Sequence, residues 1–162
     1  MKKDGGFTLI ELIAVIVIIG IIGGISALST NAAGSAAAKG CAGRINSYIA
    51  KCRTGCFSRA GDVFIRIYEQ DGKIIGEYYE GGKLSDTAAL SAGRVKVSYK
   101  VGREVKDLGK APGLKLSFYR STGGLKPQTE GGTDFCTEIY VSGGRKSYVI
   151  KIVPSTGNHS II

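Results

Sequence analysis

The chain has 162 residues, 25 glycines, 3 prolines and a formal net charge of +9, which is enough for one domain and a membrane segment. This glycine-rich, proline-poor composition favours a turn-rich β domain over a disordered chain. The basic balance fits nucleic acid, anionic lipid or an acidic partner without choosing among them. The single histidine, His159, and the four cysteines lack the spacing of a zinc site or of a catalytic pair. We therefore expect no metal, no cofactor and no enzyme activity.

A short basic leader opens the chain, and a long apolar run follows it. No charged residue occurs between Glu11 and Lys39. As a helix, residues 7–28 would span about 33 Å, enough for the hydrocarbon core of a bilayer. The lysines of the leader favour a cytoplasmic N-terminus. The sequence therefore predicts a single-pass membrane protein whose C-terminal body lies outside.

Glu11 lies inside the apolar run, where a carboxylate costs about 2.5–3.5 kcal/mol on insertion scales. A cut between Gly6 and Phe7 would explain it, because Phe7 would gain a cationic amine four residues before Glu11. The carboxylate would then lie in the first turns of a helix, where the macrodipole favours an anion. It could also pair with the amine of a neighbouring subunit. Two unit charges ~4 Å apart attract each other by about 4 kcal/mol at an effective dielectric of ~20.

Two other interpretations of the N-terminus compete with this one. A secretory signal peptide would be cleaved near the small residues 36–38, but the apolar run is longer than such a peptide needs. A plain membrane anchor would explain the length and the orientation. Neither alternative explains the carboxylate at position 11.

The sequence GFTLIEL after the leader resembles the type IV prepilin signature, which the pseudopilins of type II secretion and competence systems share. The resemblance implies cleavage after Gly6, N-methylation of Phe7 and a role for Glu11 in assembly. It also implies partners: other pilin or pseudopilin subunits, a prepilin peptidase, a membrane assembly platform and, before assembly, the lipid bilayer. Leu28 stands where many major pilins have a proline, which favours a minor subunit.

Residues 29–60 change to an amphipathic pattern that predicts a continuation of the membrane helix, packed on a globular body. The apolar stripe consists of Cys41, Ile45, Tyr48, Ile49, Cys52 and Cys56. Gly34, Gly40 and Gly43 weaken this helix, by about 1 kcal/mol each relative to alanine. They indicate either local irregularity or, as the resemblance implies, a segment that unwinds and stretches in a filament.

The cysteines also have two interpretations. They are small core residues, or Cys52 or Cys56 forms a disulfide with Cys136 that ties the helix to the sheet, which an exported location would permit. Cys41 and Cys52 are too far apart along one helix to bond to each other.

Residues 61–162 change to a period of two, which predicts β strands. The candidate strands are 63–68, 74–79, 95–101, 114–119, 135–141 and 148–153, with turns at Asp71-Gly72 and Gly143-Gly144. The expected fold class is α+β and pilin-like, with a long N-terminal helix packed on a mostly antiparallel sheet domain. The predicted segments are a cleaved leader at 1–6, a transmembrane and assembly helix at 7–28, its amphipathic continuation at 29–60 and a globular β domain at 61–162.

The C-terminal segment resembles the tail of the GspH/FimT-like minor pseudopilins. The matching positions are Phe118, Gly123, Gly124, Arg145, Ile152, Thr156 and Gly157, and Asn158 replaces the usual arginine. This resemblance implies a minor pilin or pseudopilin that helps to initiate or cap a filament. It places the chain in the inner membrane and then in an extracellular or periplasmic filament, and it leaves pilus, secretion and competence systems open.

A basic stretch in the body gives an alternative function, a filament-displayed module that captures DNA for uptake. The candidate phosphate contacts are Arg94, Lys96, Lys100, Arg103, Lys106 and Lys110. The same residues could instead form a solvated strand edge that resists edge pairing. Tyr99 alternates onto the apolar face, away from a base.

Overall fold

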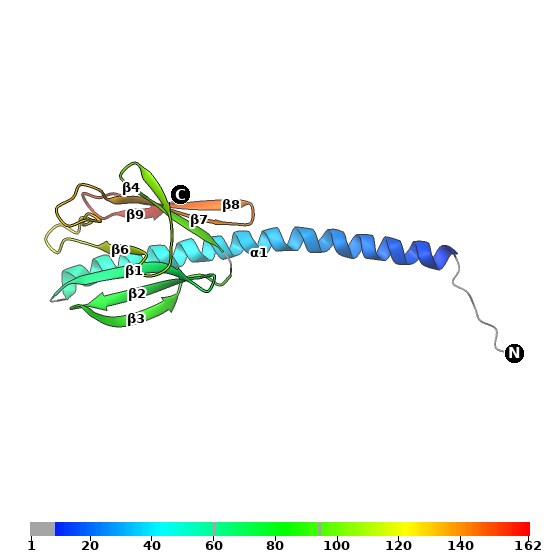
Figure 1. Cartoon of the computed structure of the whole chain (residues 1–162), viewed down its shortest axis with the longest axis horizontal. Helices are drawn as coiled ribbons and strands as arrows, with labels where there is room; N and C mark the ends of the chain where they lie inside the picture. Colours follow the sequence, from blue (N-terminus) through cyan, green and yellow to red (C-terminus); the bar gives the residue numbers. More distant parts are fainter. Residues whose placement is uncertain (1–8, 60, 94) are drawn as a thin grey trace.

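The computed structural model describes residues 9–59, 61–93 and 95–162, with no side chains described for 22–31. One long helix, α1 (Leu9–Ser58), carries the folded body around its C-terminal half and projects from it at the other end (Figure 1). The predicted cleavage site between Gly6 and Phe7 lies outside the described residues.

Helix α1 is continuous over 50 residues, which corresponds to a length of about 75 Å. Its sequence contains no proline, so every backbone amide in its interior can donate within the helix. Gly61, with φ of 96°, redirects the chain after the last turn. The glycines predicted to cause local irregularity do not interrupt the helix, and unwinding within a filament stays a prediction.

Among the described residues, nine strands follow the helix. They are β1 (Val63–Gln70), β2 (Lys73–Glu80), β3 (Lys83–Ala89), β4 (Lys96–Val101), β5 (Glu104–Asp107), β6 (Leu114–Ser117), β7 (Cys136–Gly143), β8 (Lys146–Ile152) and β9 (His159–Ile161). They form two antiparallel sheets, in the orders β3-β2-β1-β6 and β5-β4-β7-β8-β9. The α+β fold class, a long helix packed on antiparallel sheets, is confirmed.

Six of these strands match the predicted ones, and the short or exposed β3, β5 and β9 were not predicted. The turn at Asp71 and Gly72 has positive φ at both residues, 52° and 72°, as a two-residue hairpin requires. Gly81 and Gly82 make a second hairpin turn, with φ of 57° and 77°. Strand β3, which follows it, lies at a sheet edge and is mostly exposed, so its sequence lacks apolar alternation.

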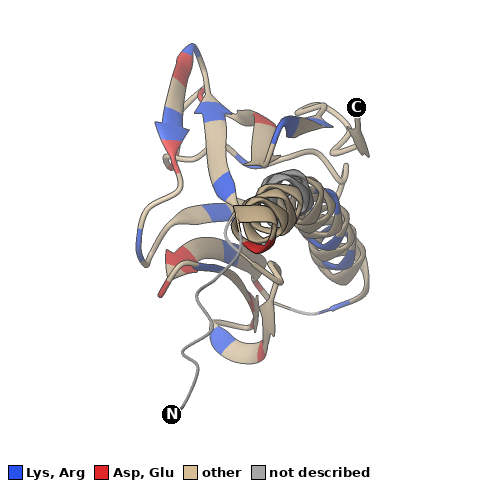
Figure 2. Ribbon diagram, turned by 90° about the vertical axis from the view of Figure 1, so that its right-hand side faces the viewer, with Lys and Arg blue, Asp and Glu red and all other residues tan. Residues whose placement is uncertain are grey.

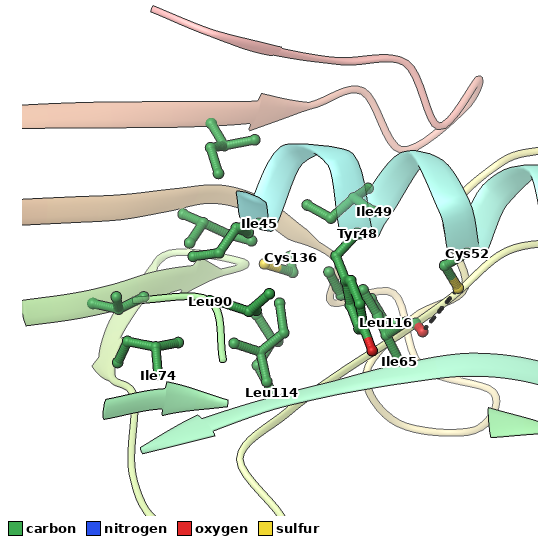
Figure 3. Close-up of a cluster of buried hydrophobic side chains, with 14 of the residues drawn as sticks. Ile45, Tyr48, Ile49, Cys52, Ile65, Ile74, Leu90, Leu114, Leu116 and Cys136 are labelled. Atoms are coloured by element: carbon green, nitrogen blue, oxygen red, sulfur yellow. Dashed lines mark hydrogen bonds between the residues drawn. The ribbon is translucent and has the colours of Figure 1, made fainter. Parts of the chain in front are cut away.

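The core lies between α1 and the two sheets, as the close-up in Figure 3 shows. All six residues of the predicted apolar stripe of α1 are buried, which confirms that stripe. Tyr48 is buried with them, and its hydroxyl donates to the carbonyl of Gly76 at 3.2 Å. Strand β4 supplies Val97, with Tyr99 packed against the same core, as its alternation predicts.

The β7–β8 turn approaches α1 closely at Gly34. A Cβ at this position would lie 2.7 Å from the backbone nitrogen of Gly144, so a side chain here would force the turn away. A Cβ at Gly40 or Gly43 would meet open space. These two glycines therefore lie on a side of α1 that the body leaves open. Viewed along the helix, the sheets lie to one side of it (Figure 2).

Candidate assembly interface

The described side chains at the N-terminal end of α1, residues 9–21, present a nearly continuous apolar surface to solvent. Its large apolar side chains are between 51% and 80% exposed: Leu9, Ile10, Leu12, Ile13, Val15, Ile16, Val17, Ile18, Ile19 and Ile21. The described part of the body covers none of them. An apolar surface of this kind normally meets another protein or a membrane. It is the part of the described chain that most requires a partner.

Glu11 is the only charged residue in this apolar surface, and it is exposed. It lies in the first turn of α1 as the structure describes the helix, where the helix dipole stabilises an anion. Its geometry relative to Phe7 falls outside the described residues.

The predicted transmembrane segment, 7–28, is only partly described, since it includes residues 7 and 8 and side chains beyond residue 21. Within the described part of the chain, none of the helical structure is sufficiently long and apolar to traverse a bilayer.

The open side of α1 continues beyond this apolar surface as a strip of small residues. We define the small-residue strip as Ala36, Gly40, Gly43, Ser47 and Thr54, of which Gly43 is half-buried and the others are exposed. At about 100° per residue, all five fall within a sector of about 60° around the helix axis. Small side chains allow a second helix backbone to approach closely.

Sequence reasoning missed this strip as a surface, because it considered the glycines only for their cost in a helix. The spacing of four, three and four residues from Ala36 to Ser47 was the available signal, since it keeps these positions on one side of a helix. The structure adds the fact that the body packs on the opposite side.

All four cysteines are free thiols, so the structure does not form the predicted disulfide from Cys52 or Cys56 to Cys136. Each of these thiols faces a different main-chain carbonyl. The thiol of Cys52 donates to Leu116 at 3.7 Å, that of Cys56 to Val63 at 3.5 Å and that of Cys136 to Glu138 at 3.9 Å. In Figure 3, Tyr48 lies between Cys52 and Cys136. The cysteines are core residues in this structure.

Thiol labelling should distinguish these cysteines from one another. Burial raises the pKa of Cys41 to about 11 and that of Cys136 to about 12, so both remain protonated and unreactive near neutral pH. The adjacent Cys52 side chain lowers the pKa of Cys56 below its ordinary value. We expect an alkylating reagent to modify Cys56 first and the other three only after unfolding. Mass spectrometry without reductant should then count four labels, whereas two labels would indicate a disulfide.

The basic residues proposed to contact DNA do not share one surface. Lys96 and Lys100 lie on one face of β4. Lys106 of β5 lies directly opposite Tyr99 in the strand register and is therefore on the other face. Arg103 lies in the turn between β4 and β5, Lys110 lies in the following loop, and Arg94 lies outside the described residues.

Acidic neighbours further reduce the positive field of this hairpin. The ammonium of Lys100 lies 3.7 Å from the Glu138 carboxylate, and that of Lys106 lies 3.4 Å from Glu104. A hydrogen bond from Tyr140, assisted by Lys100, lowers the pKa of Glu138, so this carboxylate stays charged. The arrangement resembles a mixed-charge sheet edge more closely than a phosphate-binding surface.

Comparison with known families gives a match at the N-terminus. Residues 1–27 match the model of the prokaryotic N-terminal methylation motif. This is the class III prepilin signal, and it supports a subunit of a filament of the type IV pilin or pseudopilin kind, together with cleavage by a prepilin peptidase and a methylated N-terminus. No curated protein and no solved structure matches the chain.

Proposed function

We propose that this chain is a minor pilin or pseudopilin, a structural subunit without catalytic activity. In this proposal a prepilin peptidase cuts after Gly6 and methylates Phe7, and a membrane assembly platform then transfers the subunit from the inner membrane into a filament. The observation that carries the proposal is the exposed apolar surface at residues 9–21 of α1, a helix that continues into the folded body without a break. In the membrane, lipid covers this surface, and in the filament the helices of neighbouring subunits replace the lipid.

Support for a minor rather than a major subunit comes from two places in the sequence. Leu28 stands where many major pilins have a helix-kinking proline. The C-terminal segment has the GspH/FimT-like pattern of glycine turns. In the fold, Gly123 and Gly157 have φ of 69° and 67°, and a Cβ on Gly157 would lie 2.0 Å from the carbonyl oxygen of Gly123. The two turns therefore pack against each other in a way that needs glycine.

DNA capture has less support than filament assembly. Of the basic residues assigned to it, Lys96 and Lys100 lie on one face of β4 and Lys106 lies on the other, and Lys100 and Lys106 pair with carboxylates. If this chain nevertheless binds DNA, affinity should fall steeply as salt rises.

Replacing Glu11 by alanine tests the proposal. The carboxylate is expected to guide assembly and not processing, so the E11A chain should be cleaved and inserted normally yet reach filaments in much smaller amounts. Immunoblots of membrane and sheared-filament fractions would measure this ratio. The matched control is Ile16→Val, which changes the same exposed apolar surface without touching a charge. Equal amounts of E11A and wild-type chain in filaments would show that Glu11 has no role in assembly.

A further inference from the structure

A cleft opens beside β6, on the face of its sheet that is turned away from α1. Its volume is about 470 Å³, within the range of about 300–1,000 Å³ that small-molecule sites occupy. Phe64 on β1 and Lys115 and Ser117 on β6 lie on this face, because they alternate with side chains buried in the core. The sheet itself therefore separates the cleft from α1.

The loop after β6 forms the opposite wall and is fixed to the strand by hydrogen bonds. The backbone amide of Lys126 donates to the carbonyl of Ser117 at 2.8 Å, and the side-chain amide of Gln128 donates to the carbonyl of Lys115 at 3.0 Å. Glu130 lies further along the same loop and also lines the cleft. Because both walls are tied to the sheet, the cleft is formed before a ligand arrives, which lowers the entropic cost of binding.

The charged groups that line the cleft balance one another. Lys115 and Lys126 supply cations, and Asp62 and Glu130 supply carboxylates. The ammonium of Lys126 lies 3.8 Å from the carboxylate of Asp62. The ammonium of Lys115 lies 4.5 Å from the centre of the Phe64 ring, as a cation–π contact. The cleft thus offers both hydrogen-bond donors and acceptors, without an excess of either charge among its lining residues.

An exposed aromatic ring lines the same cleft. Tyr119 is 45% exposed, and the ammonium of Lys126 lies 5.8 Å from the centre of its ring. The face of an aromatic ring is electronegative. The C–H groups on one face of a sugar ring carry a partial positive charge, so a sugar stacks favourably on such a ring. Tyr119 therefore provides an apolar platform next to the polar side chains.

These features together select one class of ligand. An anion would approach Asp62 and Glu130, and a cation would approach Lys115 and Lys126, so either would meet like charges. An apolar ligand would remove water from these charged groups without pairing them, which is costly. A small zwitterion could pair with the charges but would not use the ring. A neutral sugar has hydroxyls that donate to carboxylates and accept from ammoniums, and it has a C–H face that stacks.

We propose that this cleft binds a neutral sugar residue of a glycan, with the C–H face of the sugar on Tyr119 and its hydroxyls on Lys115, Lys126, Asp62 and Glu130. The inference goes beyond the proposed function and does not depend on it. In the proposed filament the subunits contact one another through α1, so a cleft on the far side of the sheet stays accessible. The chain would then display a glycan-binding site on the filament surface.

Saturation-transfer NMR on the full chain tests this inference. The chain would be held in a polyoxyethylene detergent, since the headgroups of alkyl-glycoside detergents would compete for the cleft. The probes are the methyl glycosides of glucose, galactose, mannose, N-acetylglucosamine and N-acetylgalactosamine at millimolar concentration. We expect saturable transfer to at least one of them, strongest at the C–H protons of its stacked face. Tyr119→Ala should weaken this binding by about tenfold, because it removes the platform.

Phe57→Ala is the matched control, because Phe57 is also 45% exposed and does not line the cleft, so this variant should bind as wild type does. Glu130→Ala is a second variant on an exposed loop, where it cannot disturb the core, and it should weaken binding by about fivefold. Near-ultraviolet circular dichroism would show whether each variant is folded. If Tyr119→Ala does not fold, the comparison of Glu130→Ala with wild type decides.

Three outcomes would overturn the inference. The first is transfer to none of these glycosides, and the second is equal binding by wild type and a folded cleft variant. The third is displacement of the glycoside by lower concentrations of inorganic phosphate or glycine, because the cleft would then prefer a charged ligand. None of these outcomes would affect the proposed function, which is tested by the amount of the chain in filaments.

Discussion

A chain with leucine at both Gly40 and Gly43 is expected to fold more stably than wild type and yet to be almost absent from filaments. Both residues lie in the interior of α1, and a Cβ at either would meet open space. Leucine is a better helix former than glycine by roughly 0.8 kcal/mol per site, so the free energy of unfolding should rise. The two large side chains would also cover the small-residue strip, so that a neighbouring helix could no longer approach closely.

This experiment is informative because the free energy of unfolding should rise while incorporation into filaments should fall. Thermal unfolding followed by circular dichroism would give the stability, and immunoblots of sheared filaments would give incorporation. Ser47→Ala is the matched control, because it keeps a small side chain on the same strip and should change neither quantity greatly. A stable double variant that enters filaments at the wild-type level would contradict close packing at this strip.

The second large effect is expected from replacing isoleucine by alanine at a buried position of α1, compared with the same replacement at an exposed position. Ile49 has no exposed surface, whereas Ile16 is 61% exposed. Ile49→Ala is therefore expected to lower the free energy of unfolding by about 2–5 kcal/mol, because it leaves a cavity between the helix and the sheets. Ile16→Ala should leave that free energy within about 0.5 kcal/mol of wild type, as exposed sites usually do.

Tyrosine signals can follow this unfolding, since the chain has 8 tyrosines and no tryptophan. Near-ultraviolet circular dichroism in a denaturant titration would report loss of packing in the body. Similar losses of stability for the two alanine variants would mean that the projecting part of α1 packs on the body, contrary to the structure.

The sequence was most informative where a single periodic pattern determined the structure. The i, i+4, i+7 spacing from Cys41 to Cys56 identified the buried side of α1 correctly, because only one side of this helix faces the core. Asp71-Gly72 located a hairpin for a similar reason, since few residue pairs accept two positive φ angles. Local rules of this kind need no knowledge of distant contacts.

Features that depend on tertiary contacts were harder to predict. Strand β3 is held by pairing with β2 at a sheet edge, and its own sequence shows little alternation. Of the two interpretations of the cysteines, the structure shows free core thiols, because Cys52, Cys56 and Cys136 each face a different main-chain carbonyl. The basic stretch looked continuous in sequence, but the pairing of β4 with β5 divides it between two faces. Such outcomes depend on register, which composition and spacing do not specify.

The N-terminus of the mature chain tests the central claim most directly. Intact-mass and N-terminal peptide analysis of protein recovered from cell membranes should find a chain that begins at Phe7 and carries one methyl group on its terminal amine. That result would place a cationic amine four residues before Glu11, as assembly through α1 requires. A chain that still begins at Met1, or one that begins near Ala38 after cleavage by a signal peptidase, would contradict the account.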